Sequence, residues 1–466
     1  MTRPTLASVL LVVSLVAGCT AASQSSPRMS PTRSPTSAPT PNPTSAPTPS
    51  PTSAPIPSPT FIAGQIELAR VNVARADSSD PDAAEAAAGI NAFGFDLHRA
   101  LAKSGGNVVF SPTSIAIALG MARAGARGET AAQMDGVLRD VASDEHANWL
   151  NSLEQALSAR SGTFEDDQGT THELTLDLTN AAFAQRDYAF EDAFLEALAS
   201  RFGAGVNLVD FATDPQAARL LINAWASEQT RERIPEVLKP DDVSAATRLA
   251  LVNAIYLKAP WYRPFPAHQT STDPFTRPDG SVIDVPTMHS SEGASCATGE
   301  GWGAMDLPYL GHTLSMLVVV PDDLVAFEAD LDADRLASID RAFTDQVAVA
   351  DVSLPKFDFE TRKSLISILV KLGMPNAFDP GAADFSGMTA EDRLYIGMVI
   401  HQANISVDEK GTEAAAVTVV GMDSSGGGPT DVCTVRADRP FLFAIRDRET
   451  GAILFMGRVV DPAASH

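Results

Sequence analysis

Cysteine and basic residues are scarce in this chain of 466 residues. Three cysteines are too few to build a framework of disulfides in so long a chain. The 34 lysines and arginines stand against 58 aspartates and glutamates, a formal net charge of -24. This balance argues against a nucleic-acid partner, which requires a basic surface. The acidic net charge is compatible with a soluble extracellular domain. Hydrophobic residues make up 44% of the chain, whose length is enough for a large core.

Common catalytic motifs are also missing. No Gly-x-Ser-x-Gly or His-Glu-x-x-His sequence occurs, and the eight histidines show no metal-ligand spacing. Ser353 and Lys356 fit the Ser-x-x-Lys of penicillin-binding hydrolases, but no Lys-Thr-Gly follows and Lys356 lies in a proline-containing strand. A triad of Ser111, His401 and an aspartate has nothing nearby to form an oxyanion hole. We therefore expect no enzyme, no metal and no cofactor.

The first 19 residues have the features of a targeting segment. Arg3 is followed by the apolar run Leu6 to Ala17, which is too short to span a bilayer. The run ends in LVAGC, which resembles the bacterial lipobox. That resemblance implies a lipoprotein signal peptide over 1–18 and lipidation of Cys19, so we expect an extracellular, membrane-anchored lipoprotein at the cell surface. The alternative is an ordinary signal peptide with a chance cysteine.

A segment rich in proline, serine and threonine follows the targeting segment. Residues 19–60 contain SAPTP-like repeats, from which no core can form. We expect a lipid-anchored linker that is extended at about 3.1 Å per residue, reaching on the order of 100 Å. Residues 61–82 are poorly defined, with Ile66 to Ala74 either a short edge strand or disordered. The folded domain is expected over 83–466.

Apolar patterns predict the main helices and strands of that domain. Ser111 and Pro112 are a favourable start for a buried helix, and Thr130 with Gln133 fits a capping box for the next one. The run Leu249 to Leu257 is apolar on both faces and predicts a central strand. Further helices are expected over Ala83 to Lys103, Phe190 to Phe202 and Ala217 to Thr230, and further strands over Leu174 to Gln185, around Ile405, and over Phe441 to Ile445.

Two motifs near the C-terminus carry a family resemblance. EKGTEAAA at 409–416 resembles the hinge of the serpins, and VRADRPFLFAI at 435–445 resembles their C-terminal signature. A Gly- and Ser-rich loop at 421–431 lies between them. The alanine run alone would predict a helix start, but two motifs in this order around a loop are highly specific. The resemblance is continuous from about Ala83 to Pro462, so we expect one domain.

The resemblance implies an α+β serpin fold with three β-sheets, about eight or nine helices and an exposed reactive-centre loop. It implies a monomeric inhibitor of serine, or else cysteine, proteases that works by trapping its target. The protease cuts the loop and forms an acyl-enzyme, the segment Thr412 to Met422 inserts into the main sheet, and the protease is distorted. The alternative is a non-inhibitory serpin that acts as a binding or surface protein, which tends to carry bulky or charged hinge residues.

The same resemblance assigns site residues. The reactive bond is placed at Ser425–Gly426 by the spacing from Glu409, whereas counting back from Pro440 gives a position near Pro429. A disulfide between Cys296 and Cys433 is allowed outside the cell, but the sequence does not fix their distance. The hinge is expected to comprise Glu409, Gly411, Thr412, Ala414, Ala416 and Thr418. A cluster of polar residues beneath the central strands, called the shutter, is expected to comprise Ser111, Ser114, Asn253 and His401. Trp261 is expected at the top of the insertion gap.

Overall fold

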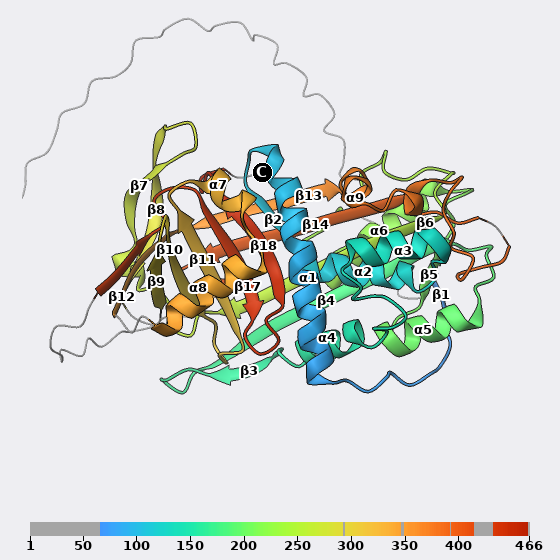
Figure 1. Ribbon diagram of the computed structural model, residues 1–466, viewed down its shortest axis with the longest axis horizontal. Helices are drawn as coiled ribbons and strands as arrows, with labels where there is room; N and C mark the ends of the chain where they lie inside the picture. Colours follow the sequence, from blue (N-terminus) through green and yellow to red (C-terminus); the bar gives the residue numbers. More distant parts are fainter. Residues whose placement is uncertain (1–65, 292–293, 346–348, 392, 414–431, 465–466) are drawn as a thin grey trace, which may run out of the picture. The chain divides into compact units, whose positions relative to one another are not determined.

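The computed structural model describes residues 66–291, 294–345, 349–391, 393–413 and 432–464. These residues form nine α-helices and three β-sheets (Figure 1). None of the described helices is long and apolar enough to cross a membrane. The helices are α1 (Asp80–Leu101), α2 (Pro112–Arg123), α3 (Gly128–Val137), α4 (Trp149–Ser158), α5 (Asp192–Phe202), α6 (Pro215–Gln229), α7 (Leu324–Ala329), α8 (Ala333–Asp345) and α9 (Ile366–Leu372).

The largest sheet, sheet A, has eight strands in the order β1-β5-β4-β6-β15-β14-β13, with β3 beside β4. Its long strands lie side by side in Figure 1. The eight strands of sheet A are β1 (Glu67–Ala69), β3 (Gly162–Glu165), β4 (Thr171–Gln185), β5 (Val206–Val209), β6 (Leu249–Pro260), β13 (Phe357–Ser364), β14 (Met398–Asp408) and β15 (Gly411–Thr412).

Two smaller sheets complete the fold. Sheet B has the order β2-β18-β17-β11-β10-β9 and sheet C the order β16-β12-β8-β7. Sheet B consists of β2 (Val108–Phe110), β9 (Ser295–Gly299), β10 (Trp302–Pro308), β11 (Leu314–Pro321), β17 (Phe441–Asp447) and β18 (Ile453–Val459). Sheet C consists of β7 (Ser271–Thr276), β8 (Val282–Ser290), β12 (Val349–Pro355) and β16 (Val432–Arg436).

Strand β6 is central, as predicted from its apolar run, which only Asn253 interrupts. It pairs with β4 on one edge and with β14 and β15 on the other. Leu251 and Ile255 pack into the main core, whereas Ala250 and Val252 pack into a second core that includes residues of α6. Because successive side chains of a strand point to opposite faces, burial of both faces requires apolar residues throughout.

The starts of several helices follow from their capping residues. The Ser111 side chain accepts a hydrogen bond from the Ser114 N–H, and Pro112 occupies the first turn of α2, as expected. The predicted capping box at Thr130 and Gln133 is wrong, because Thr130 lies inside α3, which begins at Gly128. Its hydroxyl instead accepts a hydrogen bond from the Asp384 N–H at 3.0 Å. The tertiary contact thus replaces the local one that the sequence suggested.

Candidate functional site

In the described part of sheet A, a stretch without strand pairing separates the middle of β6 from the middle of β14. The two strands pair in parallel only where Met398–His401 meets Ala250–Asn253, and β15 lies between them at the other end. Between these points, residues 402–406 and 254–258 have no described strand between them. A cavity of about 30 Å³ lies in this stretch, bordered by Thr412. Backbone groups along an open strand edge can pair with an added strand, so this gap is a candidate insertion site.

The predicted shutter residues lie together at the closed end of the gap. Asn253 of β6 and His401 of β14 are register partners, and Asn180 of β4 continues the row across the sheet. Beneath the row, the Ser114 hydroxyl donates to Asn180 Oδ1 at 3.1 Å, and the Ser111 N–H donates to His401 Nε2 at 3.1 Å. The N-terminus of α2 therefore fastens the three strands at this point.

The protonation of His401 follows from these bonds. Since Nε2 accepts from a backbone N–H, the proton is on Nδ1, which donates to Asn253 Oδ1 at 2.5 Å. Complete burial lowers the pKa of His401 to about 3, so the ring is neutral at physiological pH. Asn253 Nδ2 has no partner among the described residues, which leaves one buried donor at the place where β6 and β14 part.

At the open end, Gly411 allows the hinge to enter the sheet. A Cβ atom there would lie 2.2 Å from the Ala259 carbonyl oxygen, and the φ of 155° is unfavourable for other residues. Thr412 follows as the partner of Ala259 and Val407 and is 4% exposed. Its hydroxyl lies 2.6 Å from the Tyr309 hydroxyl. Among the described hinge residues, Thr412 is therefore part of sheet A, with its side chain buried.

Trp261, which the family resemblance assigns to the top of the gap, lies at this end of it. Its ring stacks on Tyr309 with centroids 4.5 Å apart and planes 9° apart. The indole N–H donates to the Asp408 carbonyl at 3.0 Å, and the backbone N–H donates to the Lys410 carbonyl at 2.8 Å. Two stacked rings thus support the turn that leads from β14 into β15.

Glu409 fixes the same turn from outside the sheet. Its carboxylate accepts hydrogen bonds from Lys356 Nζ at 2.8 Å and from the Thr270 hydroxyl at 2.9 Å. Burial alone would raise the pKa of Glu409, but these bonds outweigh it and hold the pKa below its usual value. Lys356, the lysine of the Ser-x-x-Lys match, therefore serves as the ion-pair partner of the hinge.

The geometry does not support the triad considered from the sequence. The Ser111 hydroxyl accepts from the Ser114 N–H, and His401 bonds to the Ser111 backbone rather than to its hydroxyl. The other ring nitrogen is bonded to Asn253, not to a carboxylate. In the described part of the chain, no group of three or more His, Cys, Asp or Glu residues is arranged to hold a metal.

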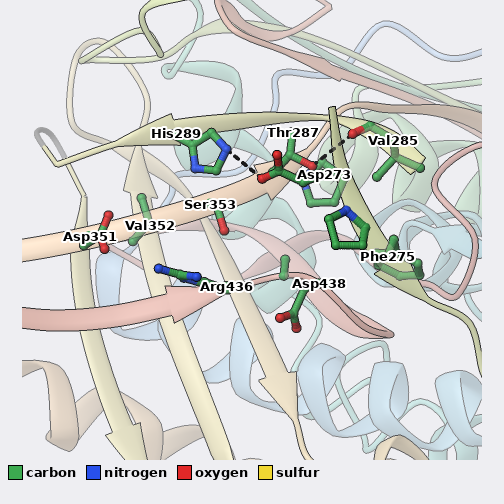
Figure 2. A pocket seen from close by; sticks show the side chains of 13 residues that line it. Asp273, Phe275, Val285, Thr287, His289, Asp351, Val352, Ser353, Arg436 and Asp438 are labelled. Carbon is green, nitrogen blue, oxygen red and sulfur yellow. Dashed lines mark hydrogen bonds and ion pairs between the residues drawn. The ribbon is translucent and has the colours of Figure 1, made fainter. Parts of the chain in front are cut away.

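A cavity of about 200 Å³ opens on sheet C. Figure 2 shows His289 of β8 turned toward Asp273 of β7. Their Nε2 and Oδ2 atoms are 2.9 Å apart. Ser353 and Arg436 also line the cavity. None of the residues that line it has a buried polar atom left without a partner in the described structure. Its strands do not border the gap in sheet A, so we do not assign it to the site.

Cys296 and Cys433 form a disulfide, which the sequence had left open. Cys296 belongs to β9 of sheet B, and Cys433 belongs to β16, the strand that follows the loop. The bond joins two sheets and holds the far end of the loop to the body of the domain.

Several predicted residues lie outside the described residues. They are Cys19 with the signal peptide and the linker, the hinge residues Ala414, Ala416 and Thr418, and the reactive bond Ser425–Gly426. Conversely, the sequence reasoning missed Asn180 and Tyr309. Asn180 lies within the strand predicted over Leu174 to Gln185. Because a buried polar side chain needs a hydrogen-bond partner, its presence in a buried strand could have identified it. Tyr309 carried no such signal.

Comparison with known proteins shows that the chain is similar to serpins over most of its length. A family model described as "Serpin (serine protease inhibitor)" matches residues 88–462. A serpin-like protein of Thermococcus kodakarensis is 38% identical over 376 residues, which cover 80% of this chain and 85% of that protein. The leukocyte elastase inhibitor of Xenopus tropicalis is 36% identical over 389 residues, which cover 79% of this chain and 97% of that protein.

Solved structures show the same fold. The native thermophilic serpin tengpin matches with a TM-score of 0.72 and 26% identity, over 85% of this chain and 100% of that one. Uncleaved ovalbumin matches with a TM-score of 0.69 and 26% identity, over 81% of this chain and 99% of that one. The expected three sheets and eight or nine helices are confirmed. The chain belongs to the serpin family.

Proposed function

We propose that this serpin inhibits proteases, most directly serine proteases, by suicide-substrate trapping. The observation that carries the proposal is the stretch of sheet A in which no described strand lies between β6 and β14, with Thr412 paired to both strands at one end of it. After a protease cuts the loop, the freed segment from Thr412 onward extends β15 between β6 and β14. The protease, held as an acyl-enzyme on the cut end, is carried along and distorted before hydrolysis completes.

The free energy for this movement comes from completing the sheet. Roughly ten ladder hydrogen bonds at about 0.5–1.5 kcal/mol each contribute on the order of 10 kcal/mol. This is comparable to the whole stability of a typical domain, about 5–15 kcal/mol. The uncut protein is therefore kept from the more stable inserted state by a kinetic barrier.

The hinge sequence favours inhibition over a purely binding role. Thr412, Ala414, Ala416 and Thr418 are the residues that would face inward, and all are small. In the described part, Thr412 already fits between Ala259 and Val407. A bulky or charged residue in this row would have to be buried at each step of insertion.

The loop sequence indicates the class of target. We place the reactive bond at Ser425–Gly426, within a segment of small and apolar residues. No arginine or lysine lies between Lys410 and Arg436, so trypsin-like proteases are poor candidates and elastase-like or subtilisin-like proteases are better ones. Sequencing the released C-terminal peptide tests the position, and a cut outside 421–430 in a trapped complex rules it out.

The test of inhibition is incubation of the soluble domain with a panel of serine and cysteine proteases. The proposal predicts an adduct of serpin and protease that survives denaturing electrophoresis, with loss of protease activity. Cleavage of the loop without any adduct, by every protease that cuts it, would favour the alternative of a non-inhibitory serpin that acts as a binding or surface protein.

We further propose that Cys19 carries the lipid anchor of a surface lipoprotein. The support is the LVAGC sequence at the end of the apolar run and the proline-rich linker that follows it. Metabolic labelling with a fatty acid should mark the wild type, whereas Cys19→Ala should be released or left unprocessed. A wild-type protein that takes up no labelled fatty acid would rule out lipidation of Cys19.

A further inference from the structure

The turn after α6 has an unusual backbone. Arg231 and Glu232 both have positive φ, 50° and 67°, which is uncommon for residues other than glycine. The turn is fixed by hydrogen bonds from the Glu232 N–H to the Ser227 carbonyl at 2.7 Å and from the Arg233 N–H to the Thr230 carbonyl at 3.0 Å. These bonds fix the backbone of the turn, and so they fix the positions from which the Arg231 and Arg233 side chains extend.

This turn spans the open gap of sheet A. On one side, the Arg231 guanidinium lies 5.1 Å from the centre of the Tyr256 ring on β6 and 3.5 Å from Asp177 on β4. On the other side, the Arg233 carbonyl accepts a hydrogen bond from Asn404 of β14 at 3.2 Å. The turn thus contacts both borders of the stretch into which a strand would insert.

Between these two anchors, the Arg233 side chain forms an ion pair with Glu413. Glu413 follows directly on β15 and is the last described residue of the hinge. Its N–H already donates to the Ser406 carbonyl at 3.0 Å, but its φ is 52°, which is far from a strand conformation. A left-handed residue with a Cβ atom is maintained only when its surroundings hold it.

We propose that Arg233 is a positioning residue of the reactive loop, which holds Glu413 and so stops insertion immediately after Thr412. Extension of β15 requires Glu413 to change from its left-handed conformation to an extended one, which displaces the paired carboxylate. The ion pair stabilises the waiting state and slows departure from it. The inference rests on the proposed function, because stopping the loop matters only if the loop inserts.

The experiment measures the hinge before and after cleavage. In uncleaved protein, hydrogen–deuterium exchange of the peptide containing Thr412 and Glu413 reports the waiting state and needs no protease. In cleaved protein, the rate at which thermal stability rises reports insertion. Arg233→Gln should accelerate both by a similar factor, about twofold to fivefold, the size expected of a partly exposed ion pair.

Matched variants separate this role from a general effect on the fold. Glu413→Gln should accelerate both processes to the same extent, and adding Arg233→Gln to it should bring no further change. Arg233→Lys should retain most of the effect of the wild type. Arg231→Gln alters the same turn, but its partner is Asp177 rather than the hinge, so exchange at Glu413 should be unchanged.

The outcomes distinguish the two proposals. If Arg233→Gln leaves both hinge exchange and insertion at wild-type rates while the wild type traps proteases, the role of Arg233 is overturned. That role is also overturned if the effects of Arg233→Gln and Glu413→Gln simply add. If hinge exchange responds as expected but no protease is ever trapped, the proposed function fails, while Arg233 remains the residue that positions the hinge.

Discussion

Thr412 is the hinge residue that pairs with both β6 and β14. Its side chain is buried beside Ala259 and bonded to Tyr309, so a charge placed there must be buried without a partner. Such a burial costs several kcal/mol, at least about 3. We expect Thr412→Arg to slow insertion but not cleavage of the loop, so that the inhibitor becomes a substrate. The number of serpin molecules consumed per protease inhibited measures this change.

A volume-conserving variant provides the control for that prediction. Thr412→Val keeps the shape but loses the bond to Tyr309, and it should still trap protease. Glu413→Arg, which the strand alternation suggests as an outward-facing control, is unsuitable because Glu413 pairs with Arg233 and is 17% exposed at its side chain. Trapping by Thr412→Arg at the wild-type ratio would contradict the insertion mechanism.

His401 should make stability depend on pH. Its pKa is about 3 in the folded protein and near 6.5 when exposed, so between these values only the unfolded chain binds the proton. This contribution to stability is therefore intact above pH 6.5 and is lost as the pH falls through the window toward 3. From pH 7 to pH 5 the loss from this one group is about 2 kcal/mol.

Urea unfolding between pH 7 and pH 5 tests the assignment. His401→Gln lowers stability by removing buried hydrogen bonds, but the loss of unfolding free energy on acidification should shrink by about 2 kcal/mol. His268→Gln, which changes an exposed histidine, should leave the pH dependence as it is. An unchanged dependence in His401→Gln would mean that this ring is not the buried neutral group.

Strand β16 is held in two ways. It pairs in parallel with β12 of sheet C, and its Cys433 is bonded to Cys296 of β9. The two cysteines are 137 residues apart, and closing so large a loop restricts the unfolded chain by on the order of 3–5 kcal/mol.

We expect reduction of this disulfide to lower the thermal midpoint of the uncleaved protein. A variant with Cys296→Ser and Cys433→Ser should melt at the reduced value with or without a reducing agent. Equal midpoints for oxidised and reduced wild type would show that β16 is held by its strand pairing alone.

Elements with a strong local pattern could be predicted from the sequence. The helix predicted from Ala83 is α1, which begins at Asp80, and the strand predicted over Leu174 to Gln185 is β4, which begins at Thr171. Ile66 to Ala74 contains the short strand β1, which pairs with β5. Errors arose where a side chain bonds to a distant segment, as Thr130 does to Asp384, because local spacing carries no record of such contacts.

Only those residues of the site that belong to a recognisable sequence motif could be predicted. Ser111, Ser114, Asn253 and His401 were found because they matched a family pattern, and their buried polar groups required partners. Tyr309 and Arg233 were missed because each meets the hinge only through tertiary structure. Nothing in the sequence distinguishes Arg233 from the other arginines. Only the tertiary structure shows that the turn after α6 lies over the gap.

At the scale of the whole domain, sheet A is the central feature, and among the described residues part of it has no strand between β6 and β14. Sheet A is closed at His401 by the shutter row and at Thr412 by the hinge, and between them the edges of β6 and β14 lack a described partner. Under the proposed function, a cut that frees the loop gives the chain access to a more stable arrangement.

The most direct test is the thermal unfolding of the soluble domain before and after its loop is cut by a protease that is then removed. Insertion predicts that the cut protein, although it has lost a peptide bond, melts at a far higher temperature than the intact one. In Thr412→Arg the same cut should give a smaller or slower rise. A wild-type protein that melts at the same temperature or lower after the cut would contradict strand insertion, because its sheet would then gain no strand.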